Sequence, residues 1–465
     1  MRALAPKLGK PFASLSLPNY RRYFAGQVVS LSGNWMQTVG ELWLVLSLTS
    51  NPLAVGITTA LQFTPMLLFG AWGGVIADRL DKRRLLMVTQ AAMALPALAL
   101  WLLAAGGAVR PWMIFALVFT RGAVNAIDNP TRQAFLVELV SSTRLVNAVG
   151  LNSALVQVAR VAGPALAGVV IATVGVATCF LINAASFGAM IVALRRMNPA
   201  ELHTDEPAPR KSGQLKSALR YVRATPGLLI PLALMAVIGT FSYNFQTLLP
   251  LLAKFSFDGR ASTYAALTAA MGVGALAGAL AVSTRREVGP KLLVAAAMAF
   301  GGGLLLAAVA PTLDTEAVSL AITGAASVTF ASSVNSTLQL RVRPSMRGRV
   351  MALYSVVLLG STPIGGPLMG WISGAMGPRD GLLLGAAAAM LGGLVARAAF
   401  ARMPDTNTGE HRIALATTPG RASAGTSLAQ SADRRSHRAQ EAAAVAARRP
   451  SPGASHPARS LRRGS

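Results

Sequence analysis

The chain has 465 residues, of which 53% are hydrophobic and only 13% are charged, and its mean hydropathy is +0.50. A soluble domain needs more polar surface than this, so the composition indicates an integral membrane protein. The 43 basic residues outnumber the 17 acidic ones, but they lie between apolar runs and not on one face, which argues against a nucleic-acid partner.

Twelve apolar runs of about 20 residues, the length that spans a bilayer, follow a basic lead at residues 1–23. They fall into two sets of six. The first set is 24–47, 54–76, 85–105, 112–128, 148–172 and 177–195, and the second is 228–252, 263–284, 291–311, 317–338, 349–374 and 382–402. We predict an all-α integral membrane fold with twelve transmembrane helices in two pseudo-symmetric six-helix bundles, 24–195 and 228–402.

Two polar segments lie between and after these sets. In the linker at 196–227, MNPAELHTDEPAPRKSG is polar, and QLKSALRYVR is typical of a basic amphipathic helix on a membrane surface. Residues 403–465 are rich in Ala, Ser, Arg, Pro and Gly without apolar periodicity. We expect them to form a disordered, basic tail.

Lysine and arginine indicate the orientation of the predicted helices. With the amino terminus inside, the outer turns hold few cations, namely Arg110, Lys254, Arg260 and Arg379. The inner segments hold many more, and an excess of Lys and Arg is typical of cytoplasmic loops. We therefore expect both termini to be cytoplasmic.

Two glycine patterns recur in the second set of runs. Gly70-x-x-x-Gly74 recurs as Gly274-x-x-x-Gly278, and Gly163-Pro164 recurs as Gly366-Pro367, at nearly the same offset. The recurrence indicates duplicated halves with a site between them. Chance agreement within glycine-rich apolar sequence is the alternative.

In the stretch from Gly70 to Arg84, GAWGGVIADRLDKRR, a predicted apolar helix ends and the chain turns in water. Gly70 and Gly74 share a helical face, so a second helix can approach their backbone closely. Asp78 and Arg79 end the helix, and a basic turn of Lys82, Arg83 and Arg84 follows them. An ordinary positive loop explains the three cations but not the ordered Gly-x-x-x-Asp-Arg before them.

This stretch resembles the signature loop of the major facilitator superfamily, Gly-x-x-x-Asp-Arg-x-Gly-[Arg/Lys]-[Arg/Lys], with Asp81 in place of the second glycine. The same departure is common in the enterobactin-exporter and macrolide-efflux-like branch. Three other stretches are also similar to that branch: residues 19–56, DNPTRQAF at 128–135 and ARVAGPALAG at 159–168. The resemblance implies alternating-access transport, with Asp78 as a gate residue near Arg347 and Arg349 of the eleventh helix.

Polar residues form one face of four predicted spans, and in the superfamily these helices line the central cavity. The stripes are Gln27, Ser30, Asn34, Gln37 and Glu41; Arg121, Asn125, Asp128 and Arg132; Thr240, Tyr243, Asn244 and Thr247; and Thr323, Ser327 and Thr337. The candidate substrate-cavity residues are Gln27, Asn34, Gln37, Asn125, Asp128, Gln157, Tyr243, Asn244, Thr247 and Ser327. Hydrogen bonding between packed helices is the alternative, and for Asp128 the alternative is a cap on a helix starting at Asn129-Pro130.

Three charges lie well inside predicted spans: Glu41, Arg121 and Arg160. Charges in the bilayer are costly and usually functional. Glu41 is the predicted proton-coupling carboxylate, because low dielectric favours its neutral form whereas a nearby Arg121 or Arg160 favours its charged form. The alternative is a permanent ion pair with one arginine that only holds helices together.

Metal and cofactor chemistry have little support in the sequence. Cys179 is the single cysteine, and the four histidines lie in the predicted linker and tail. We therefore expect no metal site. The phosphate-binding pattern Gly-x-x-x-x-Gly-Lys-[Ser/Thr] does not occur, so we expect no cofactor and no enzymatic activity.

The sequence favours a proton-coupled exporter of a small amphipathic compound, which the resemblance suggests is a siderophore or drug. Gly163-Pro164 resembles the fifth-helix motif associated with exporters, although Gly168 follows one residue late. The expected partners are the substrate, protons and the lipid bilayer of a bacterial inner (plasma) membrane, and the expected state is a monomer. An importer, or a non-transporting membrane receptor or assembly partner on the same fold, is the alternative.

Overall fold

The computed structural model describes residues 12–203, 214–283 and 289–402, and the regular elements within these ranges are all helical. The described residues belong to one compact unit, and the predicted tail at 403–465 lies outside them. The long helices of the first half are α1 (Pro18–Thr49), α2 (Pro52–Arg79), α3 (Lys82–Ala105), α4 (Pro111–Leu139), α5 (Ser142–Thr173) and α6 (Val176–Arg195). The remaining helices are α7 (Gln214–Arg223), α8 (Pro226–Phe241), α9 (Phe245–Leu251), α10 (Ala261–Ser283), α11 (Pro290–Val309), α12 (Leu313–Arg341), α13 (Arg347–Ala375) and α14 (Pro378–Ala401).

Ten helical segments among the described residues are long and apolar enough to cross a membrane. One of them, Pro226–Ser256, joins α8, α9 and a π-helical turn at Leu252–Ser256. The two long helices outside this set are α1 and α4, which carry the predicted polar stripes that contain charges. Each predicted apolar run coincides with one of these long segments. The chain is a multi-pass membrane protein.

Proline and glycine explain where several helices begin. Pro52 and Pro290 lie in the first turn of α2 and α11, where a residue without an N–H group loses no hydrogen bond. Gly175 precedes α6 with φ 97°, and Gly377 precedes α14 with φ 120°. Glycine adopts this left-handed region without a Cβ clash. A glycine with positive φ thus precedes the last helix of each half.

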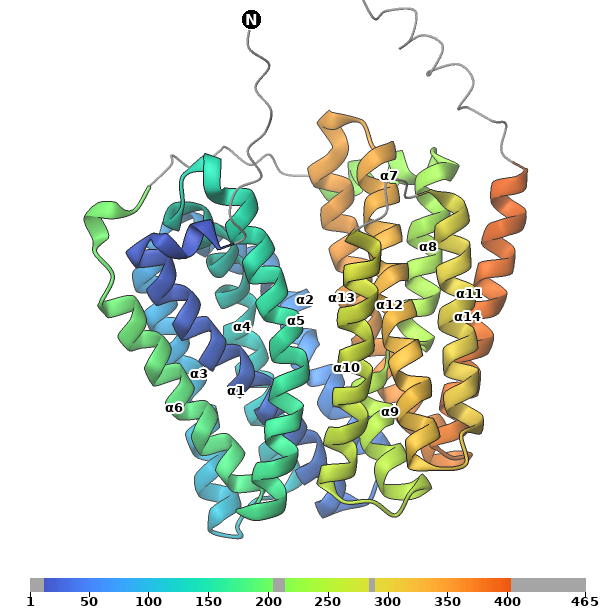
Figure 1. The fold of residues 1–465 in the computed structure, drawn as a ribbon, viewed down its shortest axis with the longest axis horizontal. Helices are drawn as coiled ribbons and strands as arrows, with labels where there is room; N and C mark the ends of the chain where they lie inside the picture. Colours follow the sequence, from blue (N-terminus) through green and yellow to red (C-terminus); the bar gives the residue numbers. More distant parts are fainter. Residues whose placement is uncertain (1–11, 204–213, 284–288, 403–465) are drawn as a thin grey trace, which may run out of the picture. The chain divides into compact units, whose positions relative to one another are not determined.

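Helices pair in the same way in both halves. The contacts between α2 and α4 correspond to those between α10 and α12, and the contacts between α3 and α6 correspond to those between α11 and α14. The contacts between α1 and α5 correspond to those between α8 and α13 (Figure 1). These pairings agree with the duplication that the glycine patterns predict.

The glycine packing in α2 differs from its prediction. A Cβ added at Gly274 would lie 1.8 Å from the carbonyl oxygen of Ala321, so α10 and α12 do touch through their backbones. In α2 the corresponding contact is made by Gly73, whose added Cβ would lie 2.1 Å from the carbonyl oxygen of Ala126 in α4. An added Cβ at Gly70 would meet only Met66 of its own helix, at 4.0 Å. The prediction that Gly70 is approached by a second helix is therefore wrong for this structure, because α4 packs along a line of α2 that does not include it.

The predicted seventh span, 228–252, is interrupted. Helix α8 ends at Phe241 and α9 begins at Phe245, with Asn244 in a non-helical conformation (φ −94°, ψ 38°). Tertiary hydrogen bonds compensate for the break, because Ser242 Oγ donates to the Gly385 carbonyl at 2.7 Å. The interruption places two residues, Tyr243 and Asn244, in the lining of the cavity described below.

Helix α7 coincides with the segment QLKSALRYVR of the predicted linker. It buries Ala218 and Val222, and it packs against α13 and α8. Its apolar face therefore covers protein. We call the end of the unit where α7 lies, where α1 begins and α14 ends, the α7 end; it is at the top of Figure 1.

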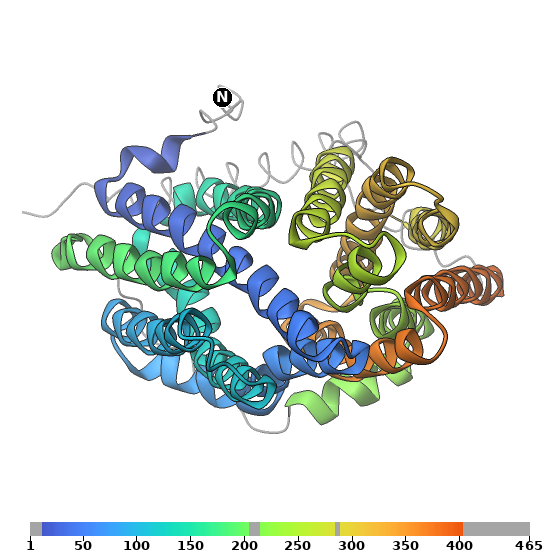
Figure 2. The ribbon, with the colours of Figure 1, turned by 90° about the horizontal axis from the view of Figure 1, so that it is seen from below.

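The two halves contact each other closely at the end opposite α7. A Cβ added at Gly56 of α2 would lie 2.3 Å from the Gly366 carbonyl oxygen of α13, and one at Gly370 would lie 2.7 Å from the Pro52 carbonyl oxygen. Lys254 Nζ donates to the Leu46 carbonyl at 2.9 Å. Figure 2, seen from this end, shows the turn between α1 and α2 reaching the helices of the second half.

Polar contacts near the α7 end join elements of the same half. Lys82 Nζ lies 2.7 Å from Glu138 Oε1, and Arg83 Nε donates to the Leu194 carbonyl at 2.7 Å. In the second half, Arg349 Nη1 donates to Ser217 Oγ at 3.3 Å. These three contacts do not join the two halves, unlike the contacts named above for the opposite end.

Candidate functional site

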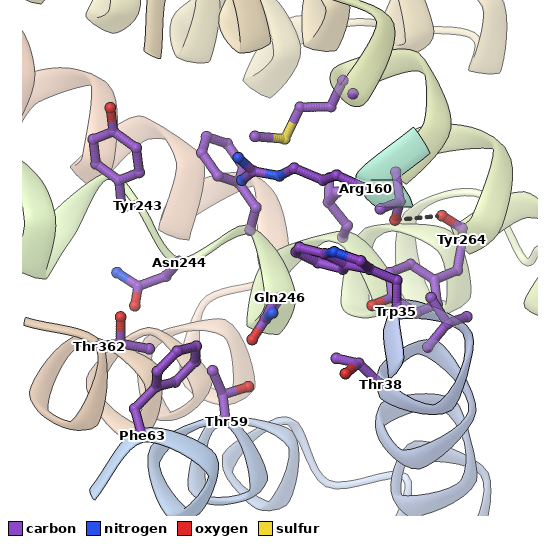
Figure 3. Close-up of a pocket in the computed structure, with 16 residues that line it drawn as sticks. Trp35, Thr38, Thr59, Phe63, Arg160, Tyr243, Asn244, Gln246, Tyr264 and Thr362 are labelled. Carbon is purple, nitrogen blue, oxygen red and sulfur yellow. Dashed lines mark hydrogen bonds between the residues drawn. The ribbon is translucent and has the colours of Figure 1, made fainter. Parts of the chain in front are cut away.

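A cavity of about 320 Å³ lies between the two halves, midway along α1, α5 and α13. Residues of α1, α2 and α5 contribute from the first half, and the segment between α8 and α9, together with α9, α10 and α13, contributes from the second (Figure 3). The lining comprises Trp35, Thr38, Val39, Thr59, Phe63, Arg160, Tyr243, Asn244, Phe245, Gln246, Leu249, Tyr264, Thr268, Met271, Gly272 and Thr362. Its volume is within the range of sites for drug-sized molecules.

Aromatic rings and one cation dominate the chemistry of this lining. Arg160 is the charged member, and its guanidinium carbon lies 5.6 Å from the centre of the Trp35 ring. This is a cation–π distance. Figure 3 shows the Arg160 side chain extending over Trp35. The cavity therefore presents flat apolar surfaces beside a positive charge.

Close helix packing positions these two side chains. A Cβ added at Gly163, one turn after Arg160, would lie 2.5 Å from Trp35 Cβ and 2.9 Å from the Ser32 carbonyl oxygen. Only glycine lets α5 approach α1 so closely. The Gly163-Pro164 element, read as an exporter motif in the sequence, thus brings Arg160 to the Trp35 ring in the structure.

The interrupted segment between α8 and α9 supplies the opposite wall. The Tyr243 hydroxyl donates to the Ser327 carbonyl, and its ring centre lies 5.0 Å from that of Phe300. Asn244 Nδ2 donates to the Thr240 carbonyl at 2.7 Å. The amide oxygens of Asn244 and Gln246 have no hydrogen-bond partner among the described residues.

Glu41 forms a buried ion pair with Arg121 and not with Arg160. Glu41 Oε2 lies 2.7 Å from Arg121 Nη2, and the two residues are 1% and 7% exposed. Gln37 Nε2 donates to Glu41 Oε1 at 2.7 Å, and Asn183 Nδ2 of α6 donates to Gln37 Oε1 at 2.5 Å. This network lies inside the first half, and its members are absent from the cavity lining.

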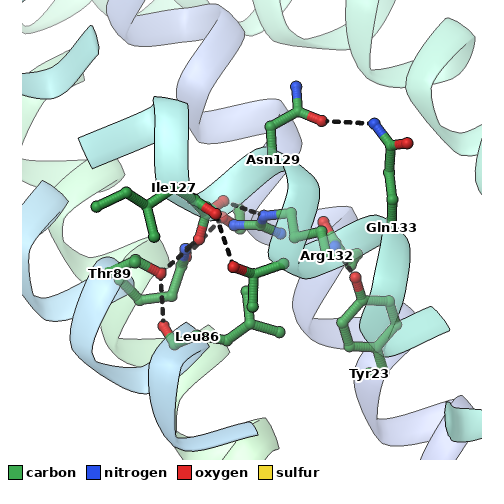
Figure 4. Close-up of polar contacts among 12 residues, drawn as sticks. Tyr23, Leu86, Thr89, Ile127, Asn129, Arg132 and Gln133 are labelled. Carbon is green, nitrogen blue, oxygen red and sulfur yellow. Dashed lines mark hydrogen bonds and ion pairs between the residues drawn. The ribbon is translucent and has the colours of Figure 1, made fainter. Parts of the chain in front are cut away.

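A second buried polar cluster surrounds Asp128, and its members Thr89 and Arg132 are labelled in Figure 4. Thr89 Oγ1 and Gln90 Nε2 of α3 donate to Asp128 Oδ1 at 2.6 and 2.8 Å, and Arg132 pairs with Oδ2. Helix α4 continues through Pro130 to Leu139, so Asp128 does not cap a new helix. Instead it joins α3 to α4.

The other predicted cavity residues lie in several places. Gln27 Nε2 donates to the Tyr23 hydroxyl at 2.6 Å, and Asn34 Oδ1 lies 3.5 Å from Asn183 Nδ2. Thr247 Oγ1 donates to Thr59 Oγ1 across the two halves at 3.2 Å. Ser327, Asn125 and Gln157 are buried or half-buried away from the cavity lining. Of the ten candidates, Tyr243 and Asn244 line the cavity.

Sequence reasoning missed the rings and the carboxylate that follow. Trp35, Phe63 and Tyr264 line the cavity but do not belong to the polar stripes, and the sequence signal for them is the presence of aromatic residues within predicted spans. Glu316, at the start of α12, lies one residue before the predicted run 317–338 and is not among the deep charges that the sequence indicates. It is fully buried, and its carboxylate oxygens have no hydrogen-bond partner among the described residues.

The signature loop is arranged at the α7 end. Asp81 caps α3, because its Oδ1 accepts a hydrogen bond from the Arg84 backbone N–H at 2.7 Å. Aspartate is a favoured N-cap residue, which explains why it can replace the superfamily's glycine here. Asp78 is half-buried, and Arg79 and Arg347 are exposed.

The sequence profile described as transmembrane secretion effector matches residues 9–421. The chain belongs to this family of the major facilitator superfamily. It is 29% identical to the staphyloferrin A transporter of Staphylococcus aureus over 244 residues, which are 52% of this chain and 61% of that one. The match thus spans less than two thirds of that relative.

Other relatives match over more of their length. The chain is 23% identical to macrolide efflux protein A of Streptococcus pyogenes (74% of this chain, 86% of that one) and 26% identical to the multidrug efflux pump Tap of Mycobacterium tuberculosis (79% and 90%). The solved nucleoside transporter NupG superposes with a TM-score of 0.65 at 13% identity, covering 84% of this chain and all of that one. A bacterial homologue of the lysosomal transporter Spinster, in an inward-facing state, gives a TM-score of 0.64 at 14% identity (82% and 96%). These likenesses establish the fold.

Proposed function

We propose that the protein is a secondary transporter that exports a small amphipathic compound by alternating access. The observation that supports this most directly is a cavity midway along the helices, lined by both halves, with tight contacts between the halves at one end. In this proposal α1 and α4 also cross the membrane, α8 and α9 together make one crossing, and twelve crossings result. Neighbouring helices shield the polar faces of α1 and α4 from lipid.

The distribution of cations orients this architecture. The α7 end carries the basic loops, so we place it, with both termini, in the cytoplasm of a bacterial cell. The cavity then belongs to a state closed on the outer side. Rocking of the two halves about the cavity would open that side and close the α7 end.

The names of the relatives suggest the cargo, and the first half supplies a candidate for coupling. Relatives are a staphyloferrin A transporter, a macrolide efflux protein and a multidrug pump, so we propose a siderophore or a drug. We propose protons as the coupling ion, with Glu41 as the carboxylate that accepts them. We expect the protein to act as a monomer.

The test is accumulation in cells with and without this chain. The panel comprises a macrolide, a catecholate siderophore, a hydroxycarboxylate siderophore and a simple aromatic carboxylate. An exporter lowers the cellular content of at least one compound, and a proton uncoupler restores it. Higher accumulation would indicate an importer, and unchanged accumulation of every compound would contradict the transporter proposal.

Asp78→Asn should impair export while leaving substrate binding unchanged. We propose that Asp78 pairs with Arg347 or Arg349 when the α7 end closes, because a carboxylate at a helix carboxyl end needs a compensating charge. Hydrogen bonds to charged groups contribute about 1.5–3 kcal/mol, so export should fall roughly tenfold or more. Asp81→Asn is the control, since asparagine also caps helices. Equal loss of binding and transport in Asp78→Asn would contradict the gate assignment.

A stop codon after Met403 should leave an inserted, active protein. Residues 404–465 contain no apolar run that could span the membrane or pack on the helices. The measurements are membrane yield and export of the compound that the full chain carries. Normal insertion with loss of export would reveal a role for the tail.

A further inference from the structure

Arg160 is a cation without a matching anion in the cavity. None of the ion pairs among the described residues includes it, and the cavity lining contains no aspartate or glutamate. The deep carboxylate of the first half, Glu41, is already paired with Arg121.

Trp35 does not replace the missing anion. Its ring lies at a cation–π distance from the guanidinium and attracts it, but a ring face carries no net charge. The planar guanidinium also offers several N–H groups, and such groups bind a carboxylate through two parallel hydrogen bonds. At the depth of the bilayer, an unpaired cation favours the entry of an anion.

We propose that Arg160 binds an anionic group of the transported compound, and that the cavity selects amphipathic carboxylates. This inference rests on the proposed function and specifies the chemistry of its substrate. The aromatic and apolar lining, with Trp35, Phe63 and Tyr264, packs against the ring or chain of the compound. The amide oxygens of Asn244 and Gln246 accept hydrogen bonds from its hydroxyl or N–H groups. Arg160 is thereby a binding residue, and Glu41 with Arg121 remains the separate candidate pair for proton coupling.

The test uses three probes that share a ring system and differ in charge: 2-naphthoate, 2-naphthamide and 2-naphthylmethylammonium. Full-length protein is placed in phosphatidylcholine nanodiscs, so that no anionic lipid competes, and binding is measured by equilibrium dialysis. Wild-type protein should bind the naphthoate at least about tenfold more tightly than the amide, because the carboxylate is negatively charged and accepts two parallel hydrogen bonds from arginine. The ammonium probe should bind most weakly.

Three variants locate the preference for the anion. Arg160→Gln should bind the naphthoate and the amide equally, whereas Arg160→Lys should keep part of the preference because it keeps the charge. Arg110→Gln, which changes an exposed arginine before α4, should behave as wild type. The wild-type comparison of the three probes tests the inference even if Arg160→Gln fails to fold.

Two results would overturn the inference: a wild-type protein that does not prefer the naphthoate, and an Arg160→Gln protein that keeps the preference. Both are separate from the accumulation assay. Export of a panel compound without an anion preference would remove this inference and leave the proposed function. An anion preference without export of any panel compound would support anion binding by Arg160 and contradict the proposed function.

Discussion

Gly56→Val is expected to abolish export, because the variant cannot close the end of the protein opposite α7. A Cβ at position 56 would lie 2.3 Å from the Gly366 carbonyl oxygen and 2.9 Å from Pro367 Cα. Both are main-chain atoms, so α2 and α13 must move apart. Overpacking costs typically about 1–3 kcal/mol, and a free-energy change of that size shifts an equilibrium roughly 5- to 150-fold. The state described here would become a minor one.

The movement can be measured with spin labels at exposed positions on that end. Ala108→Cys lies in the turn between α3 and α4, and Asp314→Cys lies in the first turn of α12. The native Cys179 is fully buried. Gly56→Val should lengthen the distance between the labels.

A glycine elsewhere controls for the substitution itself. An added Cβ at Gly188 in α6 meets no atom within 4 Å, so Gly188→Val should keep the wild-type distance and export. Wild-type distance together with wild-type export in Gly56→Val would contradict the assignment of this contact as a closed gate.

The helices could be predicted from sequence because their signal is local. A run of about 20 apolar residues has few alternatives to a spanning helix, and Pro52 or Gly175 marks a helix end through its own backbone. The break before α9 could not be predicted. It depends on Ser242 reaching the Gly385 carbonyl and Tyr243 reaching the Ser327 carbonyl, which are contacts far apart in sequence.

The polar stripes predicted which side of a helix is polar but not what that side meets. Gln37 and Asp128 face other helices of their own half, and their hydrogen bonds are satisfied there. The cavity depends on how the two halves pack. The periodicity of residues within one helix carries no information about that packing. The sequence indicates Arg160 as a deep charge, but its neighbour Trp35 and the pairing of Glu41 with Arg121 follow only from the fold.

Glu41→Gln is expected to yield a folded protein that binds and exchanges substrate but no longer responds to a proton gradient. Protonation neutralises Glu41 and would release Arg121, whereas glutamine holds position 41 in the neutral form permanently. The measurement is export into or out of proteoliposomes with and without an imposed pH gradient, using the compound that wild-type protein carries. Asp314→Asn, an exposed acidic residue of α12, is the control.

The alternative is a structural ion pair, and the geometry makes this a serious competitor. The pair is 2.7 Å long and nearly inaccessible to solvent. Removing one partner of a buried pair typically costs about 3–5 kcal/mol, because the other charge is left uncompensated. A purely structural role therefore predicts poor expression of Glu41→Gln.

The double variant Glu41→Gln with Arg121→Gln separates the two roles. It removes both charges, so no buried arginine is left unpaired and the folding cost of the single change should largely disappear. If the pair is only structural, the double variant should regain expression and gradient-driven export together. If Glu41 carries the coupling proton, the double variant should express well and still exchange substrate without using the gradient. Gradient-driven export at the wild-type rate by either variant would exclude Glu41 as the coupling residue and would point to another buried carboxylate, such as Asp128.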